Sequence, residues 1–145
     1  MKANELMIGD WVMVNDIEHT HPLQITEIYR KSGALYATLY WDGMPDNVNP
    51  ETLTADVDKV LPIPLTSEIL EKNGFEDIGD DTYQLEEKPC WFWVDFFRHN
   101  YGCEYDTSTY EYEDDEHRLK LYGIPSVHEL QHALRLCGIE KTIEL

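Results

Sequence analysis

The sequence predicts an α+β protein made of two units in tandem, and three observations lead to this fold class. Residues 1–60 contain several short apolar runs separated by turn residues, the pattern of a small SH3-like β-barrel or a strongly bent sheet. Residues 66–145 follow the order helix, four strands, helix, strand, which predicts an antiparallel meander sheet with two helices on one face. The length of 145 residues suits two small domains or one, so one continuous domain is the alternative.

The first unit is expected to carry an aromatic face. Strands are predicted at 11–14, 23–28 and 34–41, followed by a turn-rich exit over 42–50. The candidates for a binding face are Trp11, Tyr36, Tyr40 and Trp41. Aromatic side chains in so small a unit also build its core, and that interpretation is the alternative.

A stiff connector is expected between the two units. Residues 61–65 read Leu-Pro-Ile-Pro-Leu, and each proline fixes its own backbone and biases its predecessor toward an extended conformation. A helix is predicted immediately afterwards, with Thr66 as its N-cap and Gly74 at its end. Leu65 and Leu70 should form a hydrophobic staple at its start.

The second unit is expected to be built around a strand at 91–97. Its residues are apolar on both faces, which is typical of a central strand. Asp95 interrupts this run, and we expect it to pair with Arg98 or with a backbone donor. The acidic residues 76–81 are predicted to form a loop, and residues 142–145 to return as an edge strand.

The last helix lies within residues 125–139, and both of its ends are marked in the sequence. Ser126 and Glu129 form the S-x-x-E pattern of a capping box, and Gly138 fits the left-handed position just past the C-terminal end. Five apolar residues share the face that should pack on the core. They are Val127, Leu130, Ala133, Leu134 and Cys137.

The same helix contains the sequence HELQH at 128–132, an HExxH motif of the kind found in zinc hydrolases. At about 100° per residue, His128 and His132 should project on the side opposite the apolar face. In a zinc site these two histidines would be ligands, and Glu129 would be the general base that activates metal-bound water.

Two arguments favour the capping interpretation of this motif. The carboxylate of Glu129 cannot both close a capping box and face metal-bound water. Catalytic zinc also needs a third protein ligand, and no spacing in the sequence singles one out. We therefore predict no catalytic residue, no metal ligand and no cofactor, with zinc bound by HELQH as the alternative.

Charge and cysteine content indicate which partners and which cellular compartment the protein is suited to. With 11 basic and 29 acidic residues, the formal charge of −18 argues against direct binding to nucleic acids or anionic membranes, and it indicates either a basic protein partner or a role in solubility alone. The densest acidic run, 111–116, is predicted to be a solvated hairpin tip. No apolar run approaches membrane-spanning length, and the three cysteines fit reduced thiols in a cytoplasmic protein.

Three segments of the chain carry a family resemblance. MKANELMIGDWV at the start, LPIPLTSEILEKNGFE in the middle and VHELQHALRLCGI near the end resemble a group of small uncharacterised proteins of anaerobic gut bacteria, often encoded in prophages or mobile elements. About half of the chain is covered. The resemblance implies a cytoplasmic bacterial setting and brings no activity, cofactor or catalytic residue with it.

These observations lead to one main functional prediction and two alternatives. The main prediction is a non-enzymatic cytoplasmic accessory protein that binds another protein. The first alternative is a zinc-dependent hydrolase that uses HELQH. The second is an acidic mimic of DNA that inhibits a nucleic-acid-binding enzyme of the host, which would require carboxylates spaced like phosphates along one face.

Overall fold

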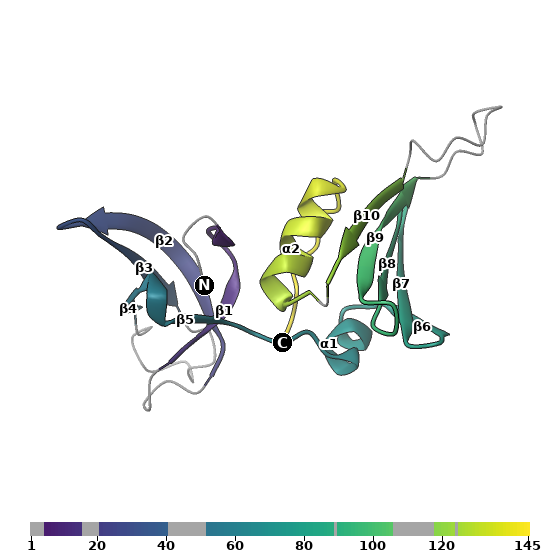
Figure 1. The fold of residues 1–145 in the computed structure, drawn as a ribbon, viewed down its shortest axis with the longest axis horizontal. Coiled ribbons are helices and arrows are strands. Elements are labelled where there is room, and N and C mark those ends of the chain that lie inside the picture. Colours follow the sequence, from purple (N-terminus) through teal and green to yellow (C-terminus); the bar gives the residue numbers. More distant parts are fainter. Residues whose placement is uncertain (1–4, 16–20, 41–51, 89, 106–117, 124) are drawn as a thin grey trace, which may run out of the picture. The chain divides into compact units, whose positions relative to one another are not determined.

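The structure is a computed structural model, and the chain divides into two compact units, Met1–Pro64 and Leu65–Leu145. Both units are built on antiparallel sheets, and the second also contains two α-helices, so the α+β class is confirmed (Figure 1). The structure describes residues 5–15, 21–40, 52–88, 90–105, 118–123 and 125–145. Trp41 and the acidic run 111–116 lie outside these residues.

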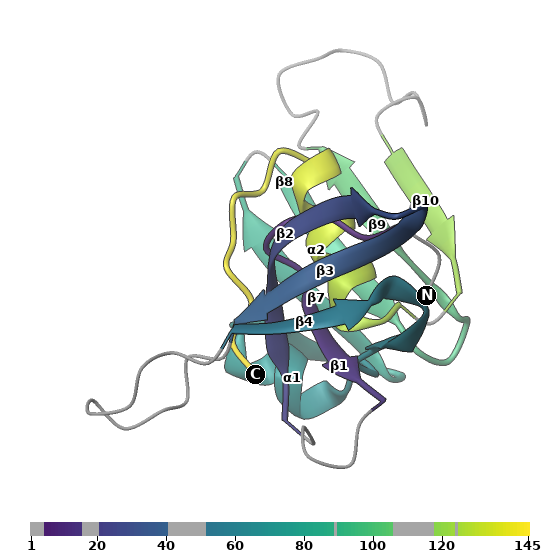
Figure 2. The ribbon, with the colours of Figure 1, turned by 90° about the vertical axis from the view of Figure 1, so that its left-hand side faces the viewer.

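The first unit is a five-stranded antiparallel sheet in the order β4-β3-β2-β1-β5. Its strands are β1 Trp11–Val14, β2 Leu23–Lys31, β3 Ala34–Tyr40, β4 Thr52–Asp56 and β5 Val60–Pro62, with a short 3-10 turn, η2, at Val57–Lys59. β2 and β3 form a long bent hairpin beside β4 (Figure 2). Because β4 and β5 are the two edges of this strand order, the described sheet is a bent, open sheet rather than a closed barrel.

Side chains alternate between a buried and a half-exposed face in this first sheet. Val12 and Val14 of β1 are buried while Trp11 and Met13 between them are half-buried. β2 and β3 continue the buried face, as expected for a sheet with one face on a core. The core contains Leu6, Val12, Val14, Leu23, Ile25, Ala37, Leu39, Ala55, Val57 and Val60.

The strand β5 is a departure from the sequence prediction. Leu61 and Pro62 were predicted to belong to the connector, but they pair with β1, with Val12 opposite Pro62 and Met13 opposite Leu61. Proline is compatible with this position because β5 is an edge strand, where a missing N–H breaks no interior ladder.

The second unit is a meander of five antiparallel strands in the order β10-β9-β8-β7-β6. Its elements are α1 Ser67–Lys72, β6 Glu76–Gly79, β7 Thr82–Glu87, β8 Cys90–Asp95, β9 Asn100–Tyr105, β10 Arg118–Tyr122 and α2 Val127–Leu136. Both helices lie on the same face of this sheet (Figure 1).

The prediction of a loop at 76–81 was wrong, because Glu76–Gly79 forms β6 and pairs with β7. All four residues of β6 are exposed, so the strand has no buried face that would mark it in the sequence. The tight connection to β7 is made by Asp80 and Asp81, both in the left-handed region with φ of 53° and 55°. Aspartate tolerates this conformation better than most residues.

The central strand of the second sheet is β8, as predicted. Its buried residues, Cys90, Phe92 and Val94, alternate with Trp91 and Trp93, which are half-buried. The strand ends at Asp95 rather than extending to residue 97, since residues 96–99 form the turn to β9.

The helices cover the face of the sheet that carries Phe92. Phe75, just after α1, meets Phe92 edge to face with ring centroids 6.3 Å apart. The predicted apolar face of α2 is buried from Val127 to Cys137. Within the described residues, no helix is long and apolar enough to cross a membrane.

The C-terminal segment does not form the predicted edge strand, because residues 139–145 adopt neither helix nor strand. The backbone of this segment hydrogen-bonds to the side chain of Asn73 instead of to a neighbouring strand. Its Nδ2 donates to Glu144 O at 2.8 Å, and its Oδ1 accepts from Glu144 N at 2.8 Å. Nζ of Lys72 also donates to Leu145 O, and Ile139 and Ile143 are buried, so polar contacts from the end of α1 and two apolar side chains hold the segment.

The three cysteines, Cys90, Cys103 and Cys137, are free and buried in the second unit. Burial raises the pKa of Cys90 to about 12, and the neighbouring thiol of Cys103 adds to the shift. Burial and the same neighbour also raise the pKa of Cys137. Thiols with raised pKa values remain protonated near neutral pH and are poor nucleophiles.

We expect Cys90 and Cys137 to resist alkylation in the folded protein. Iodoacetamide at about pH 8 reacts with thiolates, which these two residues hardly populate when folded. Mass spectrometry should find them unmodified in buffer and fully modified in urea. Modification of either residue in buffer at the rate seen in urea would contradict the prediction.

Candidate functional site

The HELQH motif begins one residue after the start of α2, and its glutamate caps the helix. The backbone N–H of Ser126 donates to Oε2 of Glu129 at 2.7 Å, and the capping box of these two residues is present. Gly138 adopts φ of +71°, and Ile139 N donates to Leu134 O at 2.9 Å. Both predicted helix ends are therefore confirmed.

The histidines of the motif differ from the sequence prediction. His128 was expected on the side away from the core, but it is only 5% exposed, whereas His132 is half-buried. The buried surface of α2 also includes Gln131, so it is wider than the apolar stripe from which the orientation was inferred. Because the buried surface of α2 extends beyond its apolar stripe, the polar residues His128 and Gln131 are buried as well.

Two contacts of His128 are made with residues of the same helix and its cap. Its Nδ1 lies 2.6 Å from Oγ of Ser126, and its ring meets the ring of His132 edge to face with centroids 5.7 Å apart. Among the described residues, no three His, Cys, Asp or Glu side chains are grouped so that they could hold a metal ion. The geometry thus gives Glu129 a capping role, and zinc binding stays the alternative prediction.

The aromatic candidates that the structure describes, Trp11, Tyr36 and Tyr40, lie on one face of the first sheet. Trp11 is opposite Gln24, and Gln24 is opposite Tyr40, so the three residues form one row across β1, β2 and β3. Tyr36 is opposite Tyr29, and their rings stack with centroids 5.9 Å apart and planes at 24°. Tyr36 and Tyr40 share the half-buried face of β3, because they are an even number of residues apart.

A hydrogen-bonded turn at residues 7–10, directly before β1, positions the row of Trp11, Gln24 and Tyr40. Asp10 is fully buried, and its Oδ2 accepts from Met7 N at 2.7 Å. Gly9 N donates to Ile25 O at 2.7 Å, and Ile25 N donates to Asp10 O at 2.9 Å. Nε2 of Gln24 donates to Gly9 O at 3.2 Å, so the central residue of the row is itself held in place.

Carboxylates flank the aromatic residues on the same face. Glu27 is exposed and accepts from Oγ1 of Thr38 at 3.2 Å, and Asp56 lies opposite Tyr36 in the register of β3 and β4. We call this surface the aromatic face, defined by Trp11, Gln24, Glu27, Tyr29, Tyr36, Tyr40 and Asp56.

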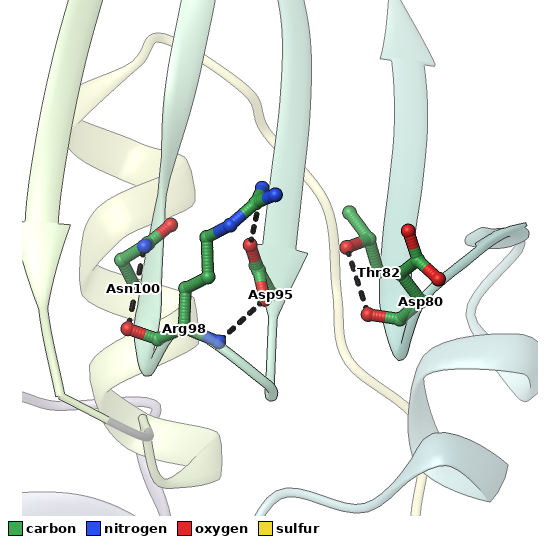
Figure 3. A network of polar contacts seen from close by, with 5 residues as sticks. All are labelled: Asp80, Thr82, Asp95, Arg98 and Asn100. Carbon is green, nitrogen blue, oxygen red and sulfur yellow. Dashed lines mark hydrogen bonds and ion pairs between the residues drawn. The ribbon is translucent and has the colours of Figure 1, made fainter.

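The pairing predicted for Asp95 is confirmed. This residue is 5% exposed, its Oδ1 accepts from Arg98 N at 2.7 Å, and its Oδ2 accepts from Arg98 Nη1 at 3.3 Å (Figure 3). Nδ2 of Asn100 donates to Arg98 O at 3.4 Å, which closes the turn between β8 and β9. The buried carboxylate therefore organises a turn.

Comparisons with protein family models, with curated proteins and with solved structures found no match for this chain. The resemblance to proteins of gut bacteria therefore stays a prediction. The function must be argued from the geometry of the chain itself.

Replacing the residues of the capping box should separate capping from catalysis. Ser126→Ala should lower the free energy of unfolding by about 1–2 kcal/mol, because the cap is lost and His128 loses a hydrogen-bond partner. Glu129→Gln should be nearly neutral, since glutamine also closes a capping box. Urea unfolding of both variants would measure this, and a cost for Glu129→Gln as large as that for Ser126→Ala would contradict the assignment.

We also expect protein purified without a metal-affinity tag to contain no stoichiometric zinc. Glu129 is engaged as a cap, and Nδ1 of His128 is engaged with Ser126. Elemental analysis of the wild type and a His132→Ala variant would test this. One zinc per chain in the wild type, lost in the variant, would establish the zinc alternative instead.

Proposed function

We infer that this protein is a non-enzymatic accessory protein that binds a basic, extended segment of another protein. The first unit would act as an SH3-like binding module, and the aromatic face would be its contact surface. The observation that carries the proposal is the register of Trp11, Gln24 and Tyr40, which form a row on the same face as the stacked pair Tyr29 and Tyr36. The pair Glu27 and Thr38 lies between them.

The chemistry of this face suits a peptide more than a compact ligand. Tyrosine and tryptophan offer a large apolar surface together with a hydrogen-bonding group, which is why both are enriched in protein interfaces. Tyr29 is 37% exposed, and Trp11, Tyr36 and Tyr40 are half-buried, so each ring is partly supported by the sheet and partly open to contact. Rings held in this way lose little conformational entropy when a partner binds.

Charge favours a basic segment as the occupant. The chain has a formal charge of −18, and Glu27 and Asp56 lie beside the tyrosines on the same face. A negative surface accelerates the encounter with a positive partner and disfavours acidic ones. Lysine and arginine side chains can also stack on the aromatic rings.

A random peptide library displayed on phage offers a direct test. We expect peptides rich in lysine and arginine to be selected by the wild-type protein. Tyr36→Ala and Tyr40→Ala should each weaken the affinity for a selected peptide about tenfold, because each removes a large part of the contact surface. Isothermal titration calorimetry would measure the affinities, with folding of each variant checked by circular dichroism.

Tyr122→Ala is the matched control. Tyr122 is 79% exposed and belongs to the second unit, so the same substitution there should leave peptide binding unchanged. Selection of no peptide, or equal losses in Tyr40→Ala and Tyr122→Ala, would refute the proposal.

A further inference from the structure

The face of the second sheet opposite the helices carries a second group of functional side chains. The register places Gln84 opposite Trp93, Trp93 opposite Gly102, and Gly102 opposite Lys120. These residues therefore form one row across β7, β8, β9 and β10. Their side chains share a face because directly opposite residues in a sheet point the same way.

Gly102 keeps the middle of this row open. A Cβ atom on Gly102 would collide with the carbonyl oxygen of Leu119 in β10, so only glycine fits between the two strands at this point. Without a side chain there, nothing in the row stands between Trp93 and Lys120.

A hollow of about 280 Å³ lies over this part of the sheet. Its lining residues are Ile78, Thr82, Gln84, Trp93, Asp95, Arg98, Asn100, Glu104 and Lys120. The volume lies just below the range of about 300–1,000 Å³ that is typical of ligand pockets, so only a small ligand would fit. Ile78 and Trp93 form the apolar part of its lining, and the other residues supply hydrogen-bonding and charged groups that could orient a ligand.

Two cations border the hollow of this strongly acidic chain. Arg98 reaches back from the β8–β9 turn so that its guanidinium lies beside the carboxylate of Asp95 (Figure 3). The bond to Asp95 uses Nη1, and the side chain is 69% exposed, which leaves further N–H groups of the guanidinium open to solvent. Nζ of Lys120 lies 5.5 Å from the ring centroid of Tyr122.

We propose that this hollow binds a small aromatic carboxylate. The ring of the ligand would pack against Trp93 and against Ile78, which is 56% exposed. The carboxylate would accept charge-assisted hydrogen bonds from Arg98 and Lys120. Gln84 lies opposite Trp93 in the same row and would hydrogen-bond polar substituents of the ring.

Two carboxylates, those of Asp95 and Glu104, also line the hollow. Asp95 accepts one hydrogen bond from the backbone N–H of Arg98 and one from its guanidinium, so a bound carboxylate would share the guanidinium with Asp95. Glu104 belongs to the next row, where it is opposite Arg118 in the register, and it makes an interaction of its own. Glu76 lies opposite Gln84 at the β6 end of the row, and charges farther away are screened beyond about 8 Å at physiological ionic strength.

Phenylacetate is a suitable probe, and ¹H–¹⁵N NMR of the full chain can follow its binding at the indole N–H of Trp93. We expect saturable shifts with a dissociation constant of about 1 mM or below. Phenylacetamide has the same shape without the charge and should bind at least about tenfold more weakly. Cyclohexylacetate keeps the charge without the aromatic ring and should also bind more weakly.

Two pairs of matched variants locate the site. Lys120→Met should weaken phenylacetate binding about tenfold, whereas Lys88→Met, the same change at a lysine that is 81% exposed outside the hollow, should leave it unchanged. Trp93→Phe should weaken binding, whereas Trp91→Phe on the same face of β8 should not. Arg98 is left intact in these variants because Asp95 depends on it.

Three results would overturn the proposal. The first is the absence of saturable shifts at about 10 mM phenylacetate, a concentration well above the expected dissociation constant. The second is equal affinity for phenylacetate and phenylacetamide, since the cations would then play no part. The third is equal weakening in Lys120→Met and Lys88→Met, or in Trp93→Phe and Trp91→Phe, with each variant shown to be folded by its NMR spectrum.

Discussion

The alternation of side chains along β8 is the constraint on which the second unit depends. Phe92 and Val94 are fully buried on the face that the helices cover, and Trp91 and Trp93 point the other way. A slip of one residue in its pairing would exchange these two sets, place tryptophans in the core and expose the phenylalanine. The same alternation therefore fixes the core on one face and places the indole of Trp93 in the lining of the hollow on the other face.

The glutamate of HELQH has a structural role at the start of the helix, where it closes a capping box. A helix that starts with a serine favours an acid three residues later, and that acid accepts from the serine N–H. The two histidines that complete the HExxH pattern lie four residues apart, and zinc binding by them stays the alternative prediction. The local contacts of Ser126, His128 and Glu129 account for all three residues in structural terms.

Features determined by neighbours in sequence were predictable, and features determined by pairing between distant segments were not. The caps at Thr66 and Ser126 and the turn donor for Asp95 involve contacts three residues apart, and all were correctly predicted. β6 was not predicted because all of its residues are exposed. Residues 142–145 were predicted to form an edge strand, but this segment is instead hydrogen-bonded by the buried amide side chain of Asn73.

The same distinction applies to the candidate sites. Trp11 and Tyr40 were singled out by residue type, but only the register shows that Gln24 joins them in one row. Lys120 and Gln84 carried no signal in the sequence, because their relation to Trp93 depends on the pairing of four strands. Alternation within a single strand assigns a side chain to a face and says nothing of its cross-strand neighbours.

The exposed, four-residue β6 has a consequence for how the protein behaves in concentrated solution. A sheet edge is a template on which a foreign strand can add, and long apolar edges lead to aggregation. Here the edge is short and begins with Glu76 and Asp77, so an incoming backbone would have to approach two carboxylates. The exposed edge strand β6 thus disfavours the addition of a strand from another copy of the chain to this sheet.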